Sequence, residues 1–293
     1  MRYRRRVKSP KVIVIGIDFS DLSDLAVETG FKLADRFRAE RVHLLHINDQ
    51  SITADIVGKV GDDWRRKMAV EKLETIKDPD LPITREVRDG IPSRDIAAAA
   101  KDVNADLIVV ATQGLGIIRR ALIGSVTSSL IRTAECPVLV VAEHRKDLEF
   151  HTVVAGVVPA PIAREVVEHA MVFAGRDGEV EIVSSLERPT TSNESIASVP
   201  TPSEYESWKR GRVKDLEALI PKMESKPKVI IEVVEESPPS NVILDHAKKR
   251  RADLIVIGTS GRNFWHRMVV GSTATHVVDD ARCPVLVVPP AQT

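Results

Sequence analysis

The stretch ALIGSVTSSLIRTAECPVLVV at residues 121–141 returns as MVVGSTATHVVDDARCPVLVV at residues 268–288. Each copy contains a Gly-Ser pair, a short helical pattern, and a Cys-Pro pair followed by an apolar strand. The two copies begin about one domain length apart in a chain of 293 residues, 43% of them hydrophobic. The repeat therefore predicts two tandem domains of the same kind.

Apolar strands alternate with amphipathic helices in both halves of the chain. The run VIVIGI at 12–17 is rich in β-branched residues, as is typical of a strand buried on both faces. Ser20 or Asp21 is placed to cap the helix that follows it. The other expected strands lie at 42–47, 83–87, 106–112, 138–141, 152–158, 180–184, 229–234, 253–259 and 285–288. The other expected helices lie at 62–77, 93–103, 161–173, 205–219 and 241–250, with two more starting at 125 and 272. This alternation predicts parallel sheets with right-handed crossovers.

The composition narrows the class of protein. Forty-two basic and 42 acidic residues give a formal net charge of zero, so no global field favours nucleic acid or anionic lipid. No apolar run approaches the roughly 20 residues that a membrane-spanning helix needs. Cys136 and Cys283 occupy the same place in the two copies, where cysteine usually acts as a small buried hydrophobe. Two unpaired cysteines fit a reducing cytoplasm.

Three segments are expected along the chain. Residues 1–10 form a basic leader, which we expect to be a solvated tail, although its arginines could also contact nucleic acid or acidic lipid. Residues 11–145 form the first domain and residues 150–293 the second. The second domain carries extra Ser, Thr and Pro residues at 187–203, which predict an exposed loop.

A glycine pattern recurs after the same kind of strand in both domains. The second copy spells G-x2-G-x9-G-S-T with Gly258, Gly261, Gly271, Ser272 and Thr273. The first copy has Ala111, Gly114, Gly124 and Ser125 at the same spacing. Glycines let the backbone approach an anion, and the unpaired amides of a helix N-terminus bind phosphate. The recurrence predicts a phosphate site in each domain.

Several enzyme classes are disfavoured by the sequence. It has no G-x4-G-K-[ST] loop, no kinase-type His-Arg-Asp loop and no G-x-S-x-G elbow. The pair at Gly114 and Gly116 lacks a third glycine and follows the fourth strand, which argues against a dinucleotide-binding domain. No histidine has a metal-ligand spacing. No catalytic residue is therefore assigned, and at most slow ATP hydrolysis is expected.

These motifs resemble the universal stress protein family in both halves. The likeness is carried by VIGIDFSDLSDLA at 14–26, LLHI at 44–47, GIPSRDIAAAA at 90–100, and the ADLIV and CPVLVV segments of each copy. The resemblance implies two tandem doubly wound α/β domains of the adenine nucleotide α-hydrolase-like fold, each with a five-stranded parallel sheet and helices on both faces. It also implies that the two last strands pair, so that one chain forms a pseudo-dimer.

The resemblance further implies an adenine nucleotide site. Asp18 would contact the sugar or base, and the backbone of Ile47 would contact adenine. The phosphates would lie on Ala111, Gly114, Gly124, Ser125 and Val126 in the first copy, and on Gly258, Gly261, Gly271, Ser272 and Thr273 in the second. The implied ligand is ATP, and Mg²⁺ can accompany it. The matching Arg120 and Arg267 would clamp phosphate or join the domains, unless they are solvated loop residues.

Each copy departs once from the family pattern. Ala111 replaces the first glycine of the first motif, and Val158 stands where Asp18 stands. Losing a ligand-bonding carboxylate costs about 1.5 to 3 kcal/mol, or roughly one to two decades of affinity. The first site is therefore expected to bind nucleotide more completely than the second.

Three functions remain open at this stage. The first is an ATP-binding regulatory protein of the stress response, acting in the cytoplasm on unidentified protein partners. The second is an interaction scaffold without nucleotide. The third is a slow ATPase, or a binder of another small ligand that uses the loop at 187–203 as a lid. A homodimer of the tandem chain is a further expectation.

Overall fold

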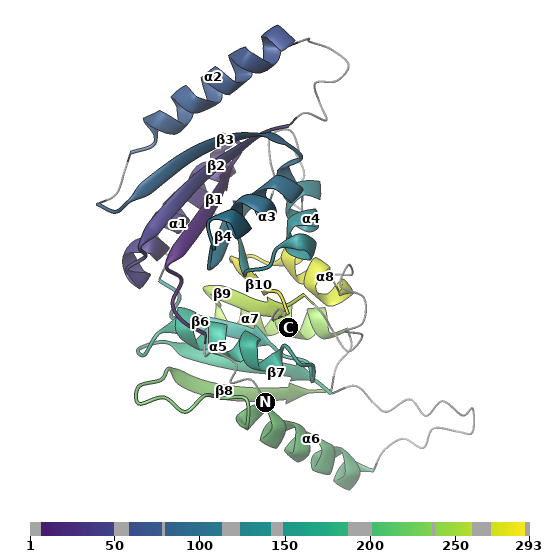
Figure 1. The fold of residues 1–293 in the computed structure, drawn as a ribbon. Helices are drawn as coiled ribbons and strands as arrows, with labels where there is room; N and C mark the ends of the chain where they lie inside the picture. The colour runs from purple at the N-terminus through teal and green to yellow at the C-terminus, as the bar shows by residue number, and fades with distance from the viewer. Residues whose placement is uncertain are drawn as a thin grey trace, which may run out of the picture.

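A ten-stranded sheet runs through the whole molecule and is covered by helices on both faces (Figure 1). The computed structural model describes residues 7–49, 59–77, 80–112, 124–141, 149–186, 201–235, 238–259 and 271–290. The strands are β1 Val12–Ile17, β2 Arg41–Asp49, β3 Ile83–Gly90, β4 Leu107–Ala111, β5 Val138–Val141, β6 Thr152–Gly156, β7 Glu179–Ser185, β8 Lys228–Val234, β9 Leu254–Gly258 and β10 Val285–Val288. The helices are α1 Asp21–Phe37, α2 Lys59–Thr75, α3 Pro92–Asp102, α4 Ser125–Thr133, α5 Ala163–Ala174, α6 Pro202–Glu217, α7 Pro239–Arg250 and α8 Ser272–Asp280.

The strand order is β3-β2-β1-β4-β5-β10-β9-β6-β7-β8, so each half contributes five parallel strands in the same relative order. The two halves meet where β5 pairs antiparallel with β10, with Leu139 opposite Leu286. The predicted fold, its tandem arrangement and the pairing of the last strands are thus confirmed. The two copies of CPVLVV are the central strands of one sheet, so neither is an exposed edge.

Successive residues of a strand point to opposite faces of the sheet and belong to two separate hydrophobic cores. Ile13 and Ile15 of β1 belong to the core under α1, α2, α5 and α6, while Val14 belongs to the core under α3, α4, α7 and α8. All three side chains are fully buried. The central strands β1, β4, β5, β6, β9 and β10 are almost entirely apolar because they are covered on both faces, whereas the outer strands β3 and β8 carry charged residues.

The domains also touch through α1 and α5, which cover the same face of the sheet. The rings of Phe37, at the end of α1, and Phe173, near the end of α5, meet edge to face with centroids 5.2 Å apart. Arg36 Nη2 donates a hydrogen bond to the Ala174 carbonyl at 3.3 Å. The ends of α1 and α5 therefore join the domains in addition to the sheet.

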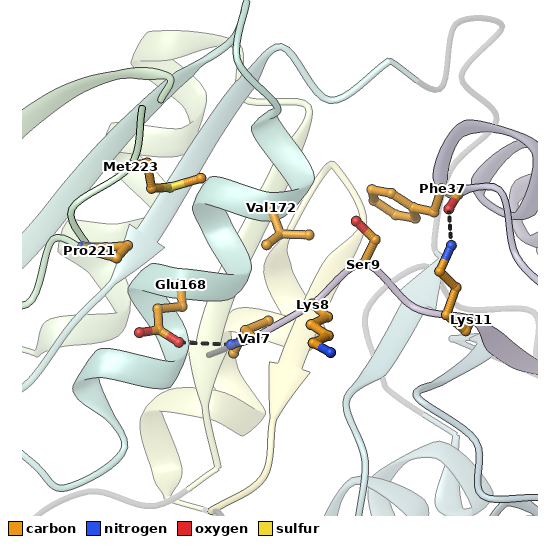
Figure 2. A pocket seen from close by; sticks show the side chains of 9 residues that line it. All are labelled: Val7, Lys8, Ser9, Lys11, Phe37, Glu168, Val172, Pro221 and Met223. Atoms are coloured by element: carbon orange, nitrogen blue, oxygen red, sulfur yellow. Dashed lines mark hydrogen bonds between the residues drawn. The ribbon is translucent and has the colours of Figure 1, made fainter. Parts of the chain in front are cut away.

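The described part of the leader lies against the second domain, contrary to the expectation of a solvated tail. The Val7 amide donates to Glu168 Oε2 on α5 at 3.1 Å, and Pro10 is buried (Figure 2). Lys11 Nζ caps the end of α1 through the carbonyls of Phe37 and Arg38. A groove of about 440 Å³ lies between this segment, Phe37, α5 and the loop after α6. Residues 1–6 lie outside the described residues.

The start of α5 differs from the prediction, and the structure shows how far each cysteine is buried. The helix expected from 161 starts at Ala163, and Ile162 is its N-cap. Cys283 is buried and Cys136 is partly exposed. Burial raises the pKa of Cys136 to about 12, so it is an inert thiol at neutral pH.

Candidate functional site

The first-domain site is built where three neighbouring strands end. Strand β1 lies between β2 and β4 and is parallel to both, so their carboxyl ends share one edge of the sheet. Asp18 follows β1, Ile47 lies near the end of β2, and Ala111 ends β4. Ligands of open α/β sheets bind outside this edge.

Asp18 is held by the turn that starts α1. Its Oδ1 accepts hydrogen bonds from the Ser20 amide at 3.0 Å and the Ser20 hydroxyl at 2.6 Å. The Ser20 hydroxyl in turn accepts from the Ser23 amide at 3.2 Å and caps the helix, as the sequence predicted. Both of these hydrogen bonds use Oδ1 of the Asp18 carboxylate.

The N-terminus of α4 lies where the sequence predicts the phosphate part of the site. Gly124 is its N-cap and has no side chain to cap the first-turn amides of Ser125 and Val126. The Gly124 amide bonds to the Thr112 carbonyl at 2.8 Å, and the Thr127 hydroxyl to the Ala111 carbonyl at 2.9 Å. These two bonds fix the helix start against the end of β4, with its positive dipole end toward the site edge.

Sequence reasoning missed a small aromatic cluster beside Asp18. Phe19 has a φ of 61°, which is unusual for a residue with a side chain. Its ring lies 4.6 Å from the His46 ring, and the Lys72 ammonium lies 5.0 Å from the Phe19 centroid. His46 Nδ1 donates to the Ile17 carbonyl at 2.8 Å. Burial lowers the pKa of His46, against the opposing effects of this hydrogen bond and of Asp18. The cluster therefore supports the turn that presents Asp18.

The second-domain site also lies where a helix begins beside the ends of parallel strands, but different residues line it. Gly271 caps α8 without a side chain, and its amide bonds to the Thr259 carbonyl at 3.0 Å. A cavity of about 200 Å³ lies at the end of β6 and β9. It is lined by the ends of those strands, by Val158, Ile162 and Ile243, and by Gly271, Ser272 and Thr273.

Some predicted site residues lie outside the described residues. These are Gly114, Gly261, Arg120 and Arg267. Within the described part of the chain, no three His, Cys, Asp or Glu side chains gather where they could hold a metal. In the same part, no helix combines the length and apolarity needed to cross a bilayer.

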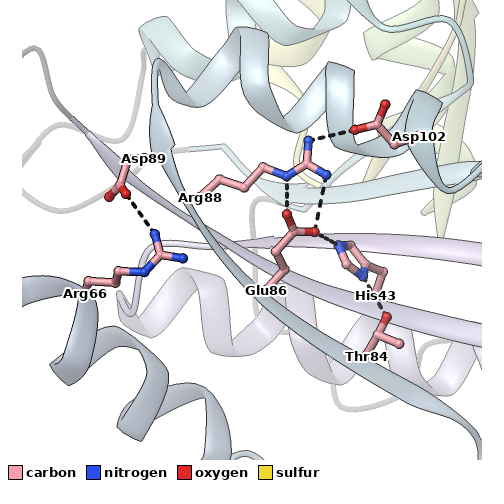
Figure 3. Close-up of polar contacts among 7 residues, drawn as sticks. All are labelled: His43, Arg66, Thr84, Glu86, Arg88, Asp89 and Asp102. Atoms are coloured by element: carbon pink, nitrogen blue, oxygen red, sulfur yellow. Dashed lines mark hydrogen bonds and ion pairs between the residues drawn. The ribbon is translucent and has the colours of Figure 1, made fainter.

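A polar cluster joins strands β2 and β3 to the end of α3 (Figure 3), and its Arg88 pairs in register with Ile47 of the candidate site. His43 Nε2 lies 2.9 Å from Glu86 Oε2, and His43 Nδ1 lies 2.6 Å from Thr84 Oγ1. Arg88 pairs with the same Glu86 carboxylate and also donates to Asp102 at 2.9 Å. Burial lowers the pKa of His43 more than Glu86 raises it, so the ring is neutral at pH 7. Although burial opposes it, Arg88 and His43 lower the pKa of Glu86.

These shifts predict that acid destabilises the protein. Burial lowers the folded-state pKa of His43 below its ordinary value of 6.5, and the same holds for His169. The neutral rings therefore contribute stability that is present above about pH 6.5 and is lost as the pH falls through the folded pKa. We expect the melting temperature to fall between about pH 7.5 and pH 5, and to fall less in His43→Gln. His276→Gln, which changes an exposed histidine, is the control. An equal fall of the melting temperature with pH in wild type and His43→Gln would contradict a contribution of buried neutral His43.

Comparison with known proteins places the chain in a family. The universal stress protein family profile matches residues 10–142 and 149–289, so the chain belongs to this family. A full-length relative is a universal stress protein of Mycolicibacterium smegmatis, 28% identical over 95% of this chain and 97% of its own. A universal stress protein structure from Archaeoglobus fulgidus covers 97% of both chains with a TM-score of 0.69 and 16% identity. A universal stress protein in complex with cAMP covers 45% of this chain and 97% of its own at 25% identity, with a TM-score of 0.31.

Proposed function

We propose that the first domain binds an adenine nucleotide, ATP with Mg²⁺, and that its occupancy regulates partner proteins in the stress response. One observation carries the proposal: Asp18 and the uncapped start of α4 lie at the same edge of the sheet, after neighbouring strands β1 and β4. A carboxylate that accepts sugar hydroxyls and a set of free helix amides are complementary to the two ends of a nucleotide.

The walls of the site support this ligand. Ile47 is 7% exposed and offers backbone groups near the end of β2. Ala111 presents a methyl group where the family pattern has glycine, so phosphate contacts fall on Gly124, Ser125 and Val126. The proposed setting is the cytoplasm, since a chain of 293 residues with only two cysteines does not depend on a disulfide framework.

The test is to measure nucleotide directly. The purified chain is denatured, released nucleotides are identified by chromatography, and the nucleotide-free protein is titrated calorimetrically with Mg·ATP. Asp18→Ala is expected to weaken binding roughly 10- to 100-fold, because the ligand loses a charged acceptor. Asp18→Asn keeps the oxygen that Ser20 needs and removes only the charge, so its binding should weaken while its melting temperature stays near wild type.

Asp24→Ala is the matched control, since Asp24 is an exposed carboxylate on the first turn of the same helix. It should bind as wild type does. No released nucleotide together with no heat of Mg·ATP binding would overturn the proposed function.

A second candidate is an interaction scaffold without nucleotide, favoured by the two departures at Ala111 and Val158. The same titration separates it from the first. Phosphate release over hours from bound ATP would identify a slow ATPase, and light scattering would show whether two tandem chains form a homodimer.

A further inference from the structure

The turn after the first strand differs between the two domains. In the first domain Phe19 adopts a φ of 61° and α1 begins at Asp21. In the second domain the matching residue is Pro159, whose ring holds φ near −65° and cannot adopt that conformation. Helix α5 accordingly begins only at Ala163, with Ile162 as its N-cap in helical conformation. The second domain therefore cannot reproduce the turn that presents Asp18.

The altered turn places Ile162 beside the first glycine of the phosphate motif. Ile162 is 4% exposed and lines the cavity together with Gly258. A Cβ atom built at Gly258 would lie 3.0 Å from Ile162 Cγ2 and 3.2 Å from Cδ1. The space that glycine leaves open is thus filled by this side chain. In the first domain Ala111 carries a methyl group at the matching position.

The remaining cavity is small and apolar on the strand side. Its volume of about 200 Å³ is below the roughly 300 to 1,000 Å³ of ordinary ligand pockets. Val157, Val158 and Ile162 form its wall near β6, and none of the described residues that line it carries a carboxylate. A ribose brought against this wall would lose its hydrogen bonds to water without gaining others.

We propose that Ile162 and Val158 close the second pocket to nucleoside triphosphates, so that each chain holds one nucleotide, in the first domain. The stoichiometry rests on the proposed function, but the closure of the second pocket does not. On this reading, Gly258 lacks a side chain so that Ile162 can pack against its backbone.

The first experiment titrates the full chain with Mg·ATP by calorimetry. Wild type should bind about one equivalent and Asp18→Ala should lose that site at the same concentrations. Adding Val158→Asp, Pro159→Phe and Ile162→Ala to Asp18→Ala should open the second pocket, release its turn from proline and restore about one equivalent. Two equivalents in wild type, or no binding by this folded quadruple variant, would overturn the closure. Binding by the quadruple variant when wild type binds nothing would support the closure and reject the proposed function.

The second experiment needs no ligand and reports on folded variants only. Gly258→Ala should lower the melting temperature by roughly 2 to 10 °C, because Ile162 must shift. In the Ile162→Ala background the same change should cost much less, since the clashing atoms are gone. Equal losses in both backgrounds would show that Gly258 does not serve Ile162 and would overturn the packing role.

Discussion

Leu286→Asp should leave no folded protein at ordinary temperatures. Leu286 is fully buried in β10, opposite the equally buried Leu139 of β5, at the pairing that joins the domains. An unpaired carboxylate there has no partner and no water, and such substitutions cost above about 4 to 5 kcal/mol. The whole stability of a domain is only about 5 to 15 kcal/mol. The milder Leu286→Ala should lower the free energy of unfolding by about 2 to 5 kcal/mol.

The measurement is urea unfolding followed by circular dichroism. Val70→Asp is the control: it puts the same group at an apolar position that is 43% exposed on α2, and should stay within about 1 kcal/mol of wild type. Should Leu286→Asp unfold at the same urea concentration as Val70→Asp, the strand pairing of β5 with β10 would not be the buried centre of the molecule.

A second pair of substitutions, both glycine to alanine within helices, should act with opposite signs. A Cβ atom at Gly30 of α1 would lie 2.3 Å from Ile15 Cδ1 and 2.8 Å from Cγ1, distances that real Cβ contacts do not show. Ile15 is fully buried, so it has little room to move. Gly30→Ala should therefore destabilise by about 1 to 3 kcal/mol. At Gly211 of α6 a Cβ atom would meet nothing within 4 Å.

Gly211→Ala should instead stabilise by about 0.5 to 1 kcal/mol, because alanine loses less backbone entropy in a helix. Thermal and urea unfolding of the two variants measure the contrast. Stabilisation by both would mean that α1 does not pack closely on β1 at Gly30. Ile15→Ala should relieve Gly30→Ala, since it removes both clashing atoms.

The fold was largely predictable because its signals are local and repeated. The apolar strands at 12–17, 138–141 and 285–288 appear in the structure at the predicted residues, and Ser20 caps α1 as expected. Helices α4 and α8 begin at the predicted residues and α7 ends at the predicted Arg250, while the other predicted helix bounds differ by one to three residues, as is usual where helix ends fray.

The walls of the candidate sites were less predictable. The sequence alone showed that Val158 replaces the carboxylate of Asp18. The contact of Ile162 with Gly258 was not predictable, because it depends on the conformation of the turn after β6, for which Pro159 is the main sequence signal. The contact of Val7 with Glu168 joins residues 161 positions apart, and no periodicity in the sequence reports such a pair. The aromatic cluster at Phe19 likewise joins three separate elements.

The antiparallel pairing of β5 with β10 has a geometric consequence for anything that binds this protein. Strands within each domain are parallel, so reversing direction at this pair sends the carboxyl ends of the two halves to opposite edges of the sheet. A short linker therefore cannot span the carboxyl ends of both halves of one chain. With the single nucleotide per chain proposed above, a tethered nucleotide dimer should bridge two chains rather than gain avidity within one.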